Sequence, residues 1–147
     1  MRIVVGVDDS DGARRALRWA LAEGQRRNAD VEVIHTFRFD VAWFDRDDFA
    51  RWEAMEQREA EASLAHILDD VAAPPGVEVA AKVVRGPAAQ VLIEASETAD
   101  LLVVGSRGRG GLTGLLFGSV SQRCVERAHC PIVVVPTHRD GSGTAPP

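Results

Sequence analysis

One segment of the chain combines residue types that could bind an anion. Six of the fourteen residues from 105 to 118 are glycine, and Ser119 and Ser121 follow at once. An apolar run at 101–104 precedes the segment and a helical pattern follows it, so it should join the end of a buried strand to the start of a helix. Glycine lets a backbone come close to a ligand, and free amides at a helix start, together with the helix dipole, favour negative charge. The amides of Gly118–Ser121 and the two hydroxyl groups therefore suit a polyphosphate, and a flexible surface loop is the alternative.

Four charged side chains near the ends of predicted strands could also take part in catalysis or in binding a ligand. Asp8 and Asp9 could form an acid–base pair or a magnesium site, but neighbouring residues on a strand point to opposite faces, which argues against a catalytic pair. Asp8 alone could contact a ligand, or it could cap a turn or a helix. Arg107 and Arg109 could clamp phosphate oxygens, or they could be solvated loop charges. The residues alone leave these alternatives open.

Composition excludes several other classes of function. Lys82 is the only lysine among 17 basic residues, and its neighbours are Ala-Ala and Val-Val, so the Gly-Lys-Ser/Thr end of a P-loop is missing. The formal net charge of -5 argues against a nucleic-acid binder. Cys124 and Cys130 have the spacing of neither a disulfide framework nor a zinc site. His35 ends an apolar strand pattern, and we interpret it as a structural residue.

The sequence shows no pattern for secretion or membrane insertion. Met1-Arg2 leads directly into a short apolar run that ends at Asp8-Asp9, unlike a signal peptide. No apolar stretch is long enough to span a membrane. We therefore expect a cytoplasmic protein without a membrane partner.

The elements that must position these residues alternate along the chain. Apolar runs predict strands at 3–7, 31–36, 77–84, 101–104 and 131–135. Helical patterns lie between them: one that Ser10 caps, one over about 47–71, one from Gly86-Pro87 to about 95, and one from Gly118-Ser119 to about 128. This alternation predicts an α/β fold, with a parallel sheet and helices on both faces. Ligands of such sheets bind at the carboxyl ends of the strands, which is where the glycine-rich segment begins.

The spacing within the glycine-rich segment makes the interpretation more specific. Gly105-x-x-Gly108, then nine residues, then Gly118-Ser119 resembles the G-2x-G-9x-G-(S/T) motif of the ATP-binding branch of the universal stress protein family. Three further segments resemble the first, second and closing strands of that family: Val5–Ser10, Val33–Thr36 and Cys130–Pro136.

The resemblance implies a doubly wound, Rossmann-like open sheet of five parallel strands in the order 3-2-1-4-5. The domain would span residues 1–137, and residues 138–147 would form a disordered tail. In this strand order the last strand lies at an edge, yet Ile132–Val135 is apolar on both faces. Because exposed apolar edges are usually covered, we expect a homodimer through this strand, which is also the habit of the family.

The resemblance also implies roles for individual residues. Asp8 would face the ribose or a phosphate-bound metal, and the backbone of Thr36 would bond the edge of the adenine. Asp9 and Thr36 depart from the residues common in the family, and Asp9 adds negative charge near the phosphates. The predicted nucleotide site comprises Gly6, Val7, Asp8, Thr36, Val104, Gly105, Arg107, Gly108, Gly118, Ser119, Val120 and Ser121, with Asp8 as the one metal candidate.

The function that the resemblance implies is binding of ATP, accompanied by Mg²⁺, by a nucleotide-responsive dimeric regulator of the stress response. Slow ATP hydrolysis is an alternative from the enzyme class, but the sequence names no base beyond Asp8, so such activity should be weak. Cyclic AMP as the ligand is a second alternative. A structural interaction module with a vestigial site is a third.

Overall fold

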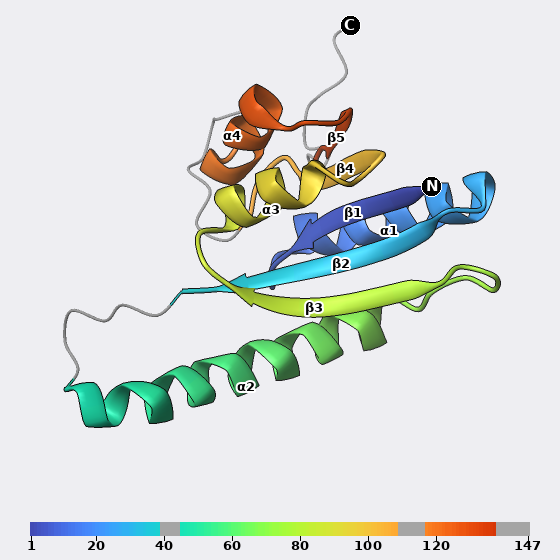
Figure 1. The fold of residues 1–147 in the computed structure, drawn as a ribbon. Helices are drawn as coiled ribbons and strands as arrows, with labels where there is room; N and C mark the ends of the chain where they lie inside the picture. The colour runs from blue at the N-terminus through green and yellow to red at the C-terminus, as the bar shows by residue number, and fades with distance from the viewer. Residues whose placement is uncertain (39–44, 109–116, 138–147) are drawn as a thin grey trace, which may run out of the picture.

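A computed structural model describes residues 1–38, 45–108 and 117–137 of the chain (Figure 1). The predicted tail at 138–147 and the predicted loop charge Arg109 lie outside the described residues. No helix in the described part has the length and apolarity that crossing a membrane requires.

Strands and helices alternate through the described residues. In chain order the elements are β1 (Arg2–Val7), α1 (Asp11–Arg27), β2 (Asp30–Phe37), α2 (Arg46–Asp70), β3 (Val79–Arg85), α3 (Ala88–Ser96), β4 (Leu101–Gly105), α4 (Ser119–Arg127) and β5 (Ile132–Val135). The strands form one sheet in the order β3-β2-β1-β4-β5, and neighbouring strands are parallel. The predicted α/β fold and its strand order are therefore confirmed.

One strand begins later than its pattern predicts. The sequence predicts a strand from residue 77, whereas β3 starts at Val79. The amide of Val77 donates to the carbonyl of Pro74 at 3.4 Å, so Val77 belongs to the turn that precedes the strand. β3 lies at one edge of the sheet, where Lys82 alternates with its apolar residues.

The helices cover both faces of the sheet because side chains on each strand alternate between the faces. On one face, Ile3 and Val5 of β1 pack in a core with residues of α1 and α2. On the other face, Val4 packs in a second core with Leu92 of α3 and Cys124 of α4. Figure 1 shows α3 and α4 together on one side of the sheet, while α2 runs along β3.

The start of α1 is fixed by two side chains from the turn after β1. The hydroxyl oxygen of Ser10, the N-cap residue, accepts a hydrogen bond from the amide of Ala13 at 3.1 Å. The same hydroxyl donates to the carboxylate of Asp8, whose Oδ1 also accepts from the amide of Ser10 at 2.9 Å. The predicted cap at Ser10 is confirmed, and Asp8 is held at the carboxyl end of β1.

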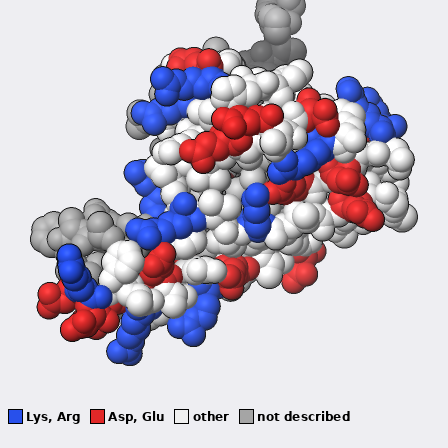
Figure 2. Space-filling model, in the orientation of Figure 1, with Lys and Arg blue, Asp and Glu red and all other residues white. Residues whose placement is uncertain are grey.

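Charges of both signs are mixed on the surface in view. Figure 2 shows Lys and Arg side chains interspersed with Asp and Glu on this face. Lys82 of β3 pairs with Glu32 of β2 at 2.5 Å, and Arg2 pairs with the same carboxylate. Burial raises the pKa of Glu32, but hydrogen bonds from Lys82 and Arg2 outweigh it and hold the pKa below its ordinary value. The only lysine thus serves a cross-strand ion pair.

Candidate functional site

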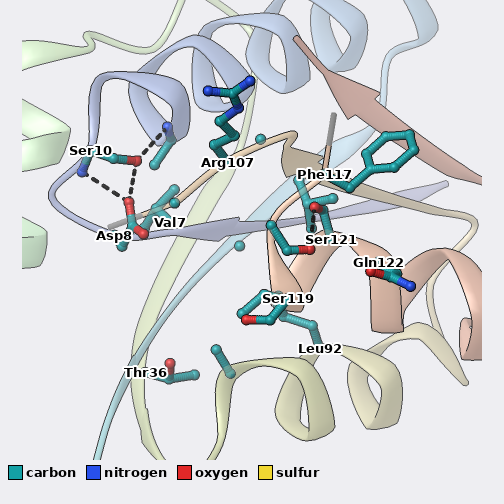
Figure 3. Close-up of a pocket in the computed structure, with 18 of the residues that line it drawn as sticks. Val7, Asp8, Ser10, Thr36, Leu92, Arg107, Phe117, Ser119, Ser121 and Gln122 are labelled. Atoms are coloured by element: carbon teal, nitrogen blue, oxygen red, sulfur yellow. Dashed lines mark hydrogen bonds between the residues drawn. The ribbon is translucent and has the colours of Figure 1, made fainter. Parts of the chain in front are cut away.

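A cavity of about 380 Å³ opens at the carboxyl ends of β1, β2 and β4 (Figure 3). The starts of α1, α3 and α4 contribute to its walls. In the order β3-β2-β1-β4-β5 the chain runs from β1 towards β2 and β3, and then returns to the other side of β1 at β4. The cavity therefore lies at the point where the strand order reverses, which is the usual ligand crevice of such sheets, and its volume suits a small molecule.

The structure brings every residue of the predicted nucleotide site to this cavity. Its lining includes all twelve: Gly6, Val7, Asp8, Thr36, Val104, Gly105, Arg107, Gly108, Gly118, Ser119, Val120 and Ser121. Segments separated by more than 80 positions along the chain thus converge on one space.

Sequence reasoning missed seven further lining residues. Ala88 and Leu92 belong to the apolar stripe of the helix predicted from Gly86-Pro87, and such a stripe does not distinguish a core from a pocket wall. Phe117 and Gln122 flank the predicted motif residues on either side. The full set missed is Ser10, Ala13, Ile34, Ala88, Leu92, Phe117 and Gln122.

One end of the cavity is apolar because a glycine faces a leucine. A Cβ atom at Gly6 would come within 2.5 Å of Leu92 Cδ1, so the side chain of Leu92 occupies the space that a larger residue in β1 would need. Ile34 and Val7 also line the cavity. This end can accept a flat apolar group such as an aromatic ring.

The start of α4 supplies hydrogen-bond donors to the cavity. The first amide of α4 with an i→i−4 hydrogen bond is that of Gln122, which donates to the carbonyl of Gly118 at 3.0 Å. For the amides of Ser119, Val120 and Ser121, no acceptor is found among the described residues. These three amides and the helix dipole make a site for an anion.

Two details differ from the predicted donor set. The amide of Gly118 was predicted to be free, but it donates to the carbonyl of Ser106 at 2.6 Å. The hydroxyl of Ser121 was predicted to face a phosphate, but it donates to the same carbonyl at 2.9 Å. The donors that remain at this helix start are therefore three amides and the hydroxyl of Ser119, which is exposed.

Asp8 takes part in the turn after β1, which is one of the two roles that the sequence left open, and it also lines the cavity. Its Oδ1 takes part in the turn that caps α1, while its Oδ2 lies where a Cβ atom of Gly108 would approach to 2.5 Å. Only glycine at position 108 leaves room for the carboxylate in this place. Asp8 is at once a turn residue and part of the cavity wall.

The described lining carries few groups that could catalyse a reaction. Asp8 is its one carboxylate and Arg107 its one basic residue, and it contains no histidine, lysine or cysteine. His35 bonds the carbonyl of Val7 through Nδ1 at 3.0 Å, which supports the structural role predicted for it. Burial raises the pKa of the Cys124 thiol to about 11, so the thiol is protonated at neutral pH. Such a lining is suited to holding a ligand.

The described residues contain no group of three or more His, Cys, Asp or Glu side chains that could hold a metal ion. A cation in the cavity would therefore have Asp8 as its one acidic ligand from the described lining. Magnesium is often bound in this way, by one or two carboxylates, water and the phosphates of a ligand. The lining thus fits a cation that arrives with an anionic ligand.

The sequence matches the model of the universal stress protein family over residues 1–136. It is 35% identical over 137 residues to universal stress protein Rv2623 of Mycobacterium tuberculosis, an alignment that covers 90% of this chain and 44% of that protein. It is 37% identical over 147 residues to universal stress protein Mb2019 of Mycobacterium bovis, covering 94% of this chain and 44% of that protein. The chain thus spans a little under half the length of these curated relatives.

Solved structures of this family share the fold. The protein UspA from Lactobacillus plantarum superposes with a TM-score of 0.78 at 21% identity, over 92% of this chain and 97% of its own. A universal stress protein in complex with cAMP gives a TM-score of 0.62 at 24% identity, over 92% and 96% of the two chains. A family member from Arabidopsis thaliana with AMP bound gives 0.61 at 20% identity, over 98% and 96%.

Proposed function

The chain belongs to the universal stress protein family, and from that premise we propose that it binds an adenine nucleotide in the cavity at the carboxyl ends of β1, β2 and β4. The observation that carries the proposal is that one cavity combines apolar lining around Leu92 with a start of α4 that has three amides to offer. A nucleotide has the same two halves, a flat base and a chain of phosphates. Related structures with AMP and with cAMP support adenine as the base.

In this proposal each half of the nucleotide has its own residues. The base lies against Gly6 and Val7 and bonds the backbone of Thr36. β1 ends at Val7, which pairs with His35, so Thr36 is the first residue of β2 beyond that pair. The phosphates take the amides of Ser119–Ser121, and Arg107 adds one positive charge to the lining.

We propose ATP, accompanied by Mg²⁺, as the ligand, and a nucleotide-responsive regulator of the stress response as the role of the protein. Three phosphates can use more of the donors at the start of α4 than one can. Asp8 is the one acidic residue of the described lining, so it is the candidate ligand of a phosphate-bound Mg²⁺. Because the described lining offers Asp8 as its only carboxylate and no histidine, any hydrolysis of ATP should be slow.

The ligand is tested by calorimetric titration with ATP, AMP and cyclic AMP, each with and without Mg²⁺. We expect ATP to bind most tightly and Mg²⁺ to strengthen ATP binding alone. The Asp8→Asn variant is the control, and it should reduce the effect of Mg²⁺ more than the affinity for AMP. Tighter binding of cyclic AMP than of ATP would favour the alternative that the cAMP complex of a relative suggests.

We also propose a homodimer through β5, the strand at the second edge of the sheet. Its four residues are only half-buried within one chain, although all four are apolar. Pairing with a second copy would cover this edge. Light scattering at micromolar concentration should then give twice the 15.9 kDa of one chain, and a monomeric mass would contradict the proposal. The domain boundary at residue 137 and the cytoplasmic location stay predictions.

A further inference from the structure

The backbone carbonyl of Ser106 collects two hydrogen bonds from the start of α4. It accepts from the amide of Gly118 at 2.6 Å and from the hydroxyl of Ser121 at 2.9 Å. Both serine residues are almost fully buried, with exposed fractions of 6% for Ser106 and 2% for Ser121. Figure 3 shows Ser121 at the start of α4, where it lines the cavity. One carbonyl thus joins the end of β4 to the helix that offers its amides to the cavity.

Ser106 is itself fixed on its other side. Its amide donates to the carbonyl of Val135 at 2.8 Å, which continues the pairing of β4 with β5. Its hydroxyl oxygen accepts from the amide of Thr137 at 3.2 Å. The carbonyl that receives Gly118 and Ser121 therefore belongs to a residue that the sheet holds in place.

The hydroxyl of Ser121 has a single hydrogen to donate. Both acceptors within reach are backbone carbonyls, that of Ser106 at 2.9 Å and that of Gly118 at 3.1 Å. With the hydrogen directed at these carbonyls, the hydroxyl is not available to donate to an anion in the cavity. The backbone amide of the same residue has no acceptor among the described residues and stays available.

We infer that Ser121 is a positioning residue, whose hydroxyl holds the start of α4 against the carbonyl of Ser106 at the end of β4. Gly118 lies 12 residues and Ser121 lies 15 residues after Ser106, and both bond its carbonyl. The bond from the Ser121 hydroxyl keeps the amides of Ser119–Ser121 directed at the cavity without itself contacting the ligand. The inference deepens the proposed function and rests on it for the identity of the ligand.

The test compares Ser121→Ala with Ser121→Thr, and it uses Ser119→Ala as the matched control because Ser119 is an exposed neighbour on the same turn. Without nucleotide, the amide of Gly118 in Ser121→Ala should exchange its hydrogen about 5- to 10-fold faster, because one hydrogen bond at the junction is lost. The affinity for ATP should fall by about the same factor, since a smaller fraction of the protein has the binding-competent helix start. Ser121→Thr should restore both values, and Ser119→Ala should leave the exchange of Gly118 unchanged.

Binding of adenosine separates positioning from general destabilisation. Adenosine has no phosphate, so its affinity should be the same in wild type and in Ser121→Ala. A loss of ATP affinity with unchanged exchange at Gly118 would show that the hydroxyl contacts the ligand, and it would overturn the inference, as would no change in either. If Ser121→Ala does not fold, Ser121→Cys provides the same comparison with a weaker donor. Failure of the wild type to bind ATP would refute the proposed function alone, because exchange at Gly118 is measured without ligand.

Discussion

Gly118→Asp is expected to abolish binding of ATP while the protein stays folded. Gly118 is the N-cap of α4, with φ -75°, a conformation that any residue can adopt. Among the described residues, the nearest neighbour of a Cβ atom there is Arg107 Cα at 3.6 Å, so these residues leave room for the new side chain. Its carboxylate would accept hydrogen bonds from the amides that the phosphates need, and it would repel the phosphates. Two unit charges 4 Å apart repel by about 4 kcal/mol at an effective dielectric constant of 20, so a loss of at least about 100-fold in affinity is expected.

Stability should change in the opposite direction to affinity. Aspartate is a good N-cap residue, and a negative charge at a helix start interacts well with the dipole. The free energy of unfolding of Gly118→Asp should therefore equal that of wild type or exceed it by up to about 1 kcal/mol. Chemical denaturation measures this change, and calorimetry measures the affinity for ATP.

Two control variants separate charge from shape at position 118. Gly118→Ala adds a methyl group without charge and should bind ATP nearly as wild type does, because the contacts of its Cβ atom with the described residues are ordinary ones. Gly118→Asn can cap the helix without repelling phosphate, so its loss of affinity should be much smaller than that of Gly118→Asp. An equal loss in Gly118→Ala and Gly118→Asp would contradict the role given to the amides of α4.

Gly6→Ala is expected to lower the stability of the protein. The added methyl group would lie 2.5 Å from Leu92 Cδ1 and 3.0 Å from Cδ2, in a core where Leu92 is almost fully buried. Overpacking of this kind costs about 1–3 kcal/mol of the free energy of unfolding. A displaced Leu92 would also narrow the apolar end of the cavity, so the affinity for adenosine should fall together with stability.

The pair can be examined in a double-mutant cycle. Leu92→Ala alone should destabilise the protein by about 2–5 kcal/mol, because it leaves a cavity between α3 and the sheet. In the double variant the methyl group of residue 6 meets no leucine. The double variant should therefore lose less free energy of unfolding than the two single variants together, by about 1 kcal/mol or more. Strict additivity would show that Gly6 and Leu92 do not constrain each other.

The residues of the site could be predicted from the sequence because the motif fixes two elements at once. Gly105 ends a strand and Ser119 begins a helix, and the parallel topology brings both to the edge where β1 and β2 end. The family resemblance that rests on this spacing therefore named twelve of the residues that line the cavity. It did not identify which donors are used within the protein, because the bonds of Gly118 and Ser121 to Ser106 depend on how the segment folds back on β4.

The contribution of α3 to the cavity was not predicted for a related reason. An apolar stripe such as Ala88 and Leu92 has the same pattern whether it faces a core or a ligand. The difference arises from Gly6, whose missing side chain lets Leu92 approach the end of β1. The sequence likewise did not show whether Asp8 belongs to a turn or lines a site. In the structure it does both, because Oδ1 accepts a hydrogen bond within the turn while Oδ2 lies beside Gly108.

We propose that the cavity holds one adenine nucleotide per chain, with its phosphates on the start of α4. Titration of ATP and Mg²⁺ into the wild type and into Gly118→Asp, under identical conditions, tests it most directly. We predict saturable binding of one ATP per chain by the wild type and none by the variant at the same concentrations. Absence of binding by the wild type, or equal binding by both proteins, would contradict the account.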